Sequence, residues 1–178
     1  EGALYVDIAG IRRRVFGMMK ELAPKGYAAV CISSFGESFV LLDKTDEVLF
    51  YPMLYTDPRG EKEAEYVRGK VGSGRLFAVT GTVPDAMYSV SKLLWIKSNC
   101  PEVYARADKL LLICDYLGYL LTGERVIDYS LAARTGVFDV HHKQFSEEIL
   151  HKLGIDKALF SRPMPTGSIV GELKGSVK

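Results

Sequence analysis

The amino-acid sequence predicts an α/β domain in which helices flank a mixed β-sheet. Short, continuously apolar segments bounded by polar turns lie within the first 55 residues, a pattern typical of strands that are covered on both faces. Beyond residue 72 the apolar residues recur mainly at helical spacing. Strands followed by covering helices, in a chain with 48% hydrophobic residues, indicate a layered domain with its own core.

The first elements are a helix and a strand. Arginine and lysine side chains occupy one face of an expected helix that ends near Pro24 and Gly26, and its other face is apolar at Ile11, Val15, Phe16, Met19 and Leu22. The segment from Tyr27 to Ile32 is apolar throughout and is followed by a serine pair. We therefore expect a strand there.

A hairpin should follow. Phe39 to Leu42 is predicted to be its first strand, Asp43 to Glu47 its polar turn, and Val48 to Tyr55 its second strand, with Pro52 marking an edge or a bulge. The next expected helix runs from Pro58 to about Arg68, with Asp57 as its cap, because proline lacks the N–H that a first helical position leaves unused.

The second half of the chain is predicted to be mainly helical. The expected helices are Asp85 to Lys97, Glu102 to Asp108, Tyr116 to Leu121 and Ser130 to Arg134. Ser146 is predicted to cap a further helix that ends at Gly154, with Phe145 and Leu150 forming a hydrophobic staple. The glycine-containing stretches 72–74 and 167–168 are interpreted as turns, and the tail from Ser161 to Lys178 as a segment that leaves the domain.

Length and charge limit the class of function. The 178 residues suffice for one domain or a large part of one. A net charge of +1 gives no support to nucleic-acid binding. The longest nearly unbroken apolar run, Val48 to Tyr55, is far shorter than the ~18 residues of a membrane span. With no leader visible, we expect a cytoplasmic protein with neither a membrane nor a nucleic acid as partner.

Neither the cysteines nor the histidines indicate a metal or redox site. The odd number, wide spacing and apolar neighbours of the cysteines predict buried free thiols in a reducing compartment for Cys31, Cys100 and Cys114. Metal-ligand spacing of the HExxH kind is absent, so surface positions are predicted for His141, His142 and His151.

Two acidic residues are the main candidates for chemistry. Glu37 and Asp57 each follow a predicted strand, and in α/β sheets ligands gather beyond the carboxyl ends of strands. Carboxylates there suit polyhydroxylated ligands, because each can accept hydrogen bonds from hydroxyl groups. In the simpler alternative, Asp57 only caps its helix and Glu37 only occupies a turn. A glycoside hydrolase would instead need the two carboxyl groups ~5 to 9.5 Å apart across a cleft.

The order of short motifs along the chain is more specific than any one of them. It comprises Ile32 to Ser38, Leu41 to Asp43, Tyr55 to Arg59, Thr80-Gly81, Ser91 to Trp95, Pro101-Glu102, Cys114 to Leu117, Leu121 to Glu124, Asp128 to Thr135, Phe138-Asp139, Leu153 to Ile155 and Gly167 to Gly171. From about Tyr5 to Gly171 this order resembles the amino-terminal domain of the FGGY carbohydrate kinases.

This resemblance implies an actin-like, ribonuclease-H-like domain that binds sugar on one side of a cleft and faces a nucleotide domain. It also implies ATP-dependent phosphorylation of a sugar or polyol hydroxyl, with ATP and Mg as cofactors of the intact protein. Residues 1–178 are then expected to form a single partial domain, without the family's first hairpin and its carboxy-terminal nucleotide domain. No turnover is expected from this chain alone, and strand edges left open favour a homodimer.

Substrate-binding residues follow from the same resemblance. Glu37 matches an acidic residue that binds substrate hydroxyls, and Gly36 stands where glycerol-type members carry Arg. Asp57 and Arg59 match an acidic and basic pair, and Tyr88 falls where some members place an aromatic ring over the substrate. No catalytic residue and no metal ligand is expected within the chain. The main alternative function is a non-catalytic sugar-binding or regulatory module on the same fold.

Overall fold

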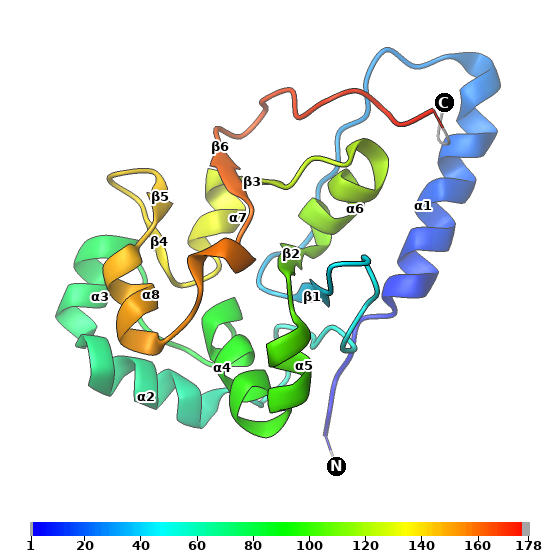
Figure 1. Cartoon of the computed structure of the whole chain (residues 1–178). Helices are drawn as coiled ribbons and strands as arrows, with labels where there is room; N and C mark the ends of the chain where they lie inside the picture. Colours follow the sequence, from blue (N-terminus) through cyan, green and yellow to red (C-terminus); the bar gives the residue numbers. More distant parts are fainter. Residues whose placement is uncertain (1, 176–178) are drawn as a thin grey trace.

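The computed structural model describes residues 2–175 (Figure 1). The helices are α1 (Ile8–Leu22), α2 (Glu61–Val71), α3 (Ser73–Thr80), α4 (Ser89–Asn99), α5 (Pro101–Arg106), α6 (Ile113–Thr122), α7 (Tyr129–Ala133) and α8 (Glu147–Leu153), with 3-10 turns η1 (Ala23–Lys25) and η2 (Lys157–Leu159). The strands are β1 (Phe39–Leu42), β2 (Lys109–Leu112), β3 (Val126–Asp128), β4 (Phe138–Asp139), β5 (Gln144–Phe145) and β6 (Arg162–Met164).

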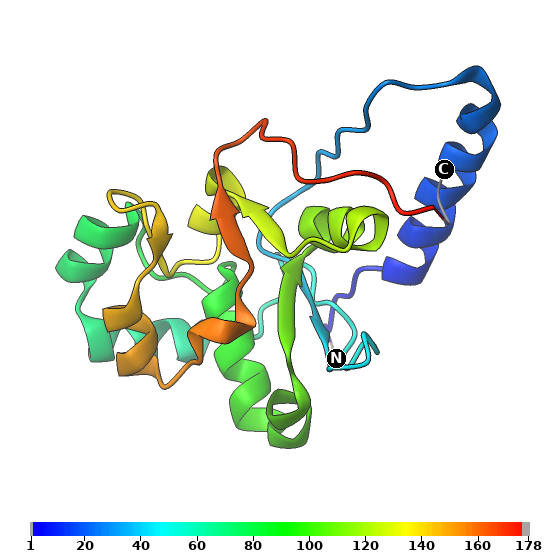
Figure 2. The same cartoon turned by 45° about the horizontal axis from the view of Figure 1, so that its top comes forward.

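The predicted mixed α/β fold is confirmed. β1 pairs with β2 in antiparallel fashion, and β3 pairs with β6 in parallel. A parallel bridge between Leu110 and Phe160 joins β2 to the segment that leads into β6. The four strands thus form one discontinuous layer with helices around it (Figure 2), while β4 and β5 make a separate short hairpin.

The core lies on both faces of β1 and β2. Phe39 and Leu41 face a large cluster that includes side chains of α2, α4 and α8, whereas Val40 and Leu42 face a smaller cluster with α6 and the start of α1. Alternate residues of a strand point to opposite faces, and here both faces are apolar. This arrangement explains why the continuously apolar run predicted a strand correctly.

The first helix is confirmed, but the strand after it is not. The Asp7 side chain caps α1 by accepting a hydrogen bond from the Gly10 N–H at 2.8 Å. Residues 27–32 form no strand, and most of them are exposed. All three cysteines are free as predicted, but the prediction that they are buried is wrong for Cys31, which is exposed, and Cys100 and Cys114 are only partly buried. In Figure 1 this stretch and α1 lie at one edge of the molecule.

The predicted strand from Val48 to Tyr55 is also wrong in its extent. Only two single bridges form in this segment: Val48 pairs with Leu42, and Met53 pairs with Tyr5. Pro52 has no N–H and cannot continue a hydrogen-bonded ladder. Its carbonyl instead accepts a hydrogen bond from the Val6 N–H at 2.8 Å, so the chain's first residues take the place of a hairpin partner.

Several helix boundaries differ from the sequence predictions. α2 begins at Glu61 after Gly60, whose φ of 106° favours glycine, so Asp57 does not cap it. α4 begins at Ser89 rather than at Asp85, and α3 was missed because its Gly72 and Ser73 suggested a turn. The predicted cap of α8 is confirmed: the Ser146 side chain accepts from the Ile149 N–H, and Gly154 ends the helix in the left-handed region.

The strands β2, β3 and β6 were not predicted. β2 leads directly into α6, so its leucines suggested the helical pattern that continues beyond them. β6 falls within the tail that was expected to leave the domain. That tail returns to the body once more, because the Lys174 N–H donates to the Leu121 carbonyl oxygen at 2.8 Å. No helix in the described part of the chain is long and apolar enough to span a membrane.

Candidate functional site

The loop before β1 holds Glu37 in an unusual backbone conformation. Glu37 has a φ of 62°, a left-handed value that is uncommon for residues other than glycine. Its carbonyl oxygen accepts a hydrogen bond from the Ser89 hydroxyl at 2.7 Å, and Ser89 is fully buried at the first position of α4. The loop is therefore fastened to the start of α4, and this contact fixes the direction of the Glu37 side chain.

The Glu37 carboxylate pairs with Arg134, which directly follows α7. The Arg134 Nε donates to Oε1 of Glu37 at 2.5 Å, and Nη2 forms an ion pair with the same oxygen. The Glu37 side chain is only 6% exposed, whereas that of Arg134 is 38% exposed. The Arg134 guanidinium also lies over the ring of Tyr88, 5.1 Å from its centroid. Three segments distant in sequence thus meet at one buried carboxylate.

Gly36 borders the same ion pair. A Cβ atom at position 36 would lie 3.1 Å from Cγ and 3.3 Å from Cβ of Arg134, tighter than ordinary contacts. The stem of Arg134 therefore uses the space that a side chain at position 36 would need. Arg134 was missed as a site residue: it belongs to the motif from Asp128 to Thr135, but nothing in that motif points to Glu37.

Asp57 and Arg59 form a second ion pair, which is bidentate. Oδ1 of Asp57 accepts from Nε of Arg59 at 2.7 Å, and Oδ2 accepts from Nη2 at 2.8 Å. The backbone N–H of Leu4 donates to Oδ2 at 2.6 Å, and that of Arg59 donates to Oδ1 at 2.9 Å. Asp57 is 1% exposed. Burial alone would raise the pKa of the Asp57 carboxyl, but these donors outweigh it and lower the pKa to about 2.

Neighbouring groups hold this second pair in place. The Arg59 guanidinium lies 4.8 Å from the ring centroid of Tyr5 and 5.1 Å from that of Trp95. The buried Lys92 ammonium group donates to the carbonyl oxygens of Asp57 and Arg59, at 2.6 Å in the case of Arg59. Burial lowers the pKa of Lys92. The Asp57–Arg59 pair and Lys92 therefore stabilise the conformation of residues 57–59.

The first turn of α4 connects the two acidic loops. Ser89 contacts the backbone of Glu37, and Lys92, one turn further along, contacts the backbone of Asp57. The rings of Phe35 and Tyr55, which belong to the two loops, lie 6.1 Å apart. Both oxygens of Asp57 accept hydrogen bonds from Arg59 or from the backbone. This geometry removes the glycoside hydrolase alternative, which needs two available carboxyl groups.

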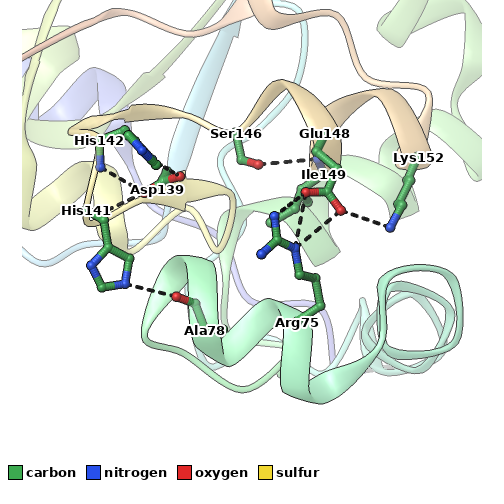
Figure 3. A network of polar contacts seen from close by, with 9 residues as sticks. All are labelled: Arg75, Ala78, Asp139, His141, His142, Ser146, Glu148, Ile149 and Lys152. Atoms are coloured by element: carbon green, nitrogen blue, oxygen red, sulfur yellow. Dashed lines mark hydrogen bonds and ion pairs between the residues drawn. The ribbon is translucent and has the colours of Figure 1, made fainter.

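The histidines have structural contacts at the surface, as Figure 3 shows. Nε2 of His141 lies 3.0 Å from the carbonyl oxygen of Ala78, and Nδ1 of His142 lies 2.8 Å from Oδ2 of Asp139. His151 is exposed in the last turn of α8. In the described range 2–175, no group of three or more His, Cys, Asp or Glu side chains could hold a metal ion.

A cavity of about 790 Å³ lies away from Glu37, between α1, α6 and the segment 48–52. Its lining includes Ile8, Arg12 and Tyr116 and none of the proposed substrate-binding residues. The cavity is therefore not part of the candidate site.

Comparison with known proteins gives consistent matches. Residues 12–178 match the model of the amino-terminal domain of the FGGY family of carbohydrate kinases. Xylulose kinase of Lactococcus lactis is 29% identical over 172 residues, covering 96% of this chain and 34% of the relative. Rhamnulokinase of Enterococcus faecalis is 33% identical over 143 residues, covering 80% of this chain and 28% of the relative. The chain thus spans about a third of the length of these curated relatives.

Solved structures agree on the fold. The xylulose kinase of Rhodospirillum rubrum superposes with a TM-score of 0.91 at 24% identity, covering 99% of this chain and 38% of that one. At this identity the likeness establishes the fold and not the substrate. With the family match over most of its length, the chain belongs to the FGGY family of carbohydrate kinases and corresponds to their amino-terminal, actin-like domain.

Proposed function

We propose that this chain is the sugar-binding part of a kinase that phosphorylates a hydroxyl group of a sugar or polyol. The observation that carries the proposal is the Glu37 carboxylate, which is buried and held by Arg134 through one oxygen only. Membership of the FGGY family and the names of the relatives, which include xylulose kinase and rhamnulokinase, support the substrate class.

In this proposal Glu37 holds substrate hydroxyl groups. An ionised carboxylate is only an acceptor, so it selects ligands that offer O–H donors in the right place. A site built to hydrogen-bond a hydroxyl rejects analogues that lack it, because its own polar groups are then left unpaired. Tyr88 supplies an aromatic ring under the Arg134 guanidinium, and Gly36 leaves room for the stem of Arg134. Asp57 and Arg59 shape the pocket from behind rather than contacting substrate.

ATP and Mg are the cofactors that we propose for the intact protein. Phosphoryl transfer depends on positioning and on stabilising the charge of the γ-phosphate. The described residues include no cluster of acidic side chains that fits Mg, so no step of the transfer is assigned to them. The contribution of this domain is to bind the acceptor and orient its hydroxyl.

We further propose that residues 1–178 are a single partial domain that has no turnover by itself. The chain's coverage of only about a third of its relatives' length supports this view. Strand edges left open in a partial domain favour association, so we propose that the isolated chain can form a homodimer. We place the intact enzyme in the cytoplasm, where ATP is supplied.

The proposal is tested by measuring ATP consumption by the full-length protein against a panel of sugars and polyols, with residues 1–178 assayed beside it. We expect turnover with one acceptor or a few related ones, and only by the full-length protein. Sugar binding without ATP consumption on any acceptor would instead support a non-catalytic sugar-binding or regulatory module. Turnover by residues 1–178 alone would contradict the partial-domain proposal.

A further inference from the structure

We propose that Arg134 is a positioning residue that presents the free oxygen of Glu37 to the acceptor, and that Gly36 is small so that Arg134 can take this place. The inference deepens the proposed function and rests on it. It assigns a role to a residue that lies 97 positions from Glu37 in the sequence.

The hydrogen-bond geometry is asymmetric. Both Nε and Nη2 of Arg134 meet Oε1 of Glu37, and no described residue donates to Oε2. Arg134 therefore holds the carboxylate from one side, through a charge-assisted hydrogen bond and an ion pair that both reach Oε1. The second oxygen is then left as the acceptor that a substrate hydroxyl can use.

Burial makes this arrangement necessary. A carboxylate that is 6% exposed and had no partner would carry a large desolvation cost. Arg134 supplies the compensating positive charge beside Glu37.

The backbone on both sides of the pair is fixed. The Arg134 N–H donates to the Leu131 carbonyl oxygen at 2.9 Å, which ends α7. The next residue, Thr135, accepts at its carbonyl oxygen a hydrogen bond of 2.9 Å from the Val90 N–H in α4. Because α4 also binds the backbone of Glu37 through Ser89, one helix aligns both partners.

The small size of Gly36 leaves room for the stem of Arg134. Its φ is not in the left-handed region, so its backbone conformation does not require glycine. Because Cγ and Cβ of Arg134 approach closely, a larger residue there would have to displace the stem of Arg134.

The test compares Arg134→Gln with Arg134→Lys in the full-length protein, with Arg75→Gln as the matched control. Arg75 pairs with Glu148 at the surface, so its loss removes an Arg–Glu pair without touching the site. For Arg134→Gln we expect the KM for the acceptor to rise roughly 10- to 100-fold, the size expected for losing a hydrogen bond to a charged group. The KM for ATP should not change.

Arg134→Lys should recover part of the loss, because an ammonium group restores the charge but not the planar guanidinium. An unchanged acceptor KM in a folded Arg134→Gln protein would overturn the inference while leaving the proposed function intact. An equal rise in the KM for ATP would also overturn it, since it would indicate general damage. No turnover by the wild-type protein on any acceptor would instead overturn the proposed function.

A milder variant guards against misfolding. Gly36→Ala adds one methyl group against the stem of Arg134, whereas Gly74→Ala adds one where nothing lies within 4 Å. We expect Gly36→Ala to raise the acceptor KM severalfold and Gly74→Ala to leave it unchanged. Equal acceptor KM values for the two variants would contradict the pairing of Gly36 with Arg134.

Discussion

Two of the arginine–glutamate pairs in this domain have the same chemistry and different surroundings. Arg134 and Glu37 meet in the interior, where the Glu37 side chain is 6% exposed. Arg75 and Glu148 link α3 to α8 at the surface, with side chains 53% and 39% exposed (Figure 3). Solvent screens the second pair, and water can replace either partner. Only the buried pair creates a carboxylate whose contacts are set in advance, which is what a binding site needs.

The carboxylate of the surface pair has a second hydrogen-bond donor. Glu148 accepts from Arg75 and from Lys152, one turn along α8. These hydrogen bonds lower the pKa of Glu148 to about 2. A low pKa therefore does not identify a functional carboxylate here, because Asp57, whose oxygens are all occupied, has a similarly low pKa.

The largest expected effect on stability is at the second buried pair. Asp57→Ala leaves the Arg59 guanidinium, 17% exposed, without its carboxylate. Removing one partner of a buried pair typically costs about 3–5 kcal/mol. Urea unfolding of the chain should show this loss of unfolding free energy. A loss of unfolding free energy below ~1 kcal/mol would show that the Asp57 carboxylate stabilises the fold no more than a surface carboxylate does.

The pH dependence of the unfolding free energy should also distinguish Asp57 from an ordinary carboxylate. The pKa of Asp57 is held below its value in the unfolded chain, so its stabilisation is fully present above about pH 4 and is lost as the pH falls toward 2. The shift corresponds to about 2 kcal/mol. Unfolding free energies measured between pH 2 and 7 should fall less steeply in acid for Asp57→Asn than for the wild type. Identical slopes would show that this carboxylate is not specially stabilised.

The smallest expected effect is at the surface. Arg75→Ala removes an exposed ion pair, so its loss of unfolding free energy should be the smallest of these variants. The difference from the wild type should shrink further at high salt, because exposed charges are screened. Urea midpoints at low and high salt provide the measurement. If Arg75→Ala lost as much unfolding free energy as Asp57→Ala, the exposed and the buried ion pair would not differ in stability.

Local patterns predicted those parts of the fold that depend on local interactions. The strand Phe39 to Leu42 and the helix cap Ser146 were predicted correctly. Burial on both faces of a strand and helix capping both depend on residues that are adjacent in the sequence. Residues 27–32 have a strand-like composition but form no strand, since pairing depends on a neighbour. β2 was hidden because its leucines continue directly into α6.

Local sequence patterns also predicted only part of the candidate site. Glu37 could be proposed from its place after an apolar segment and from the order of family motifs. Arg134 could not, because no local signal connects residues 97 positions apart. Asp57 was expected to cap a helix or to face substrate; instead, Arg59 and the backbone of Leu4 occupy both of its oxygens. Only the tertiary structure separates the available carboxylate from the occupied one.

The most direct test of the central claim compares Glu37→Gln with Glu148→Gln in the full-length protein. Each change removes one carboxylate from an arginine pair, one buried and one exposed. Kinetics with the best acceptor should show a large fall in kcat/KM for that acceptor in Glu37→Gln, little change in the KM for ATP, and near wild-type values in Glu148→Gln. Unchanged acceptor kinetics in Glu37→Gln would show that this carboxylate does not hold the substrate.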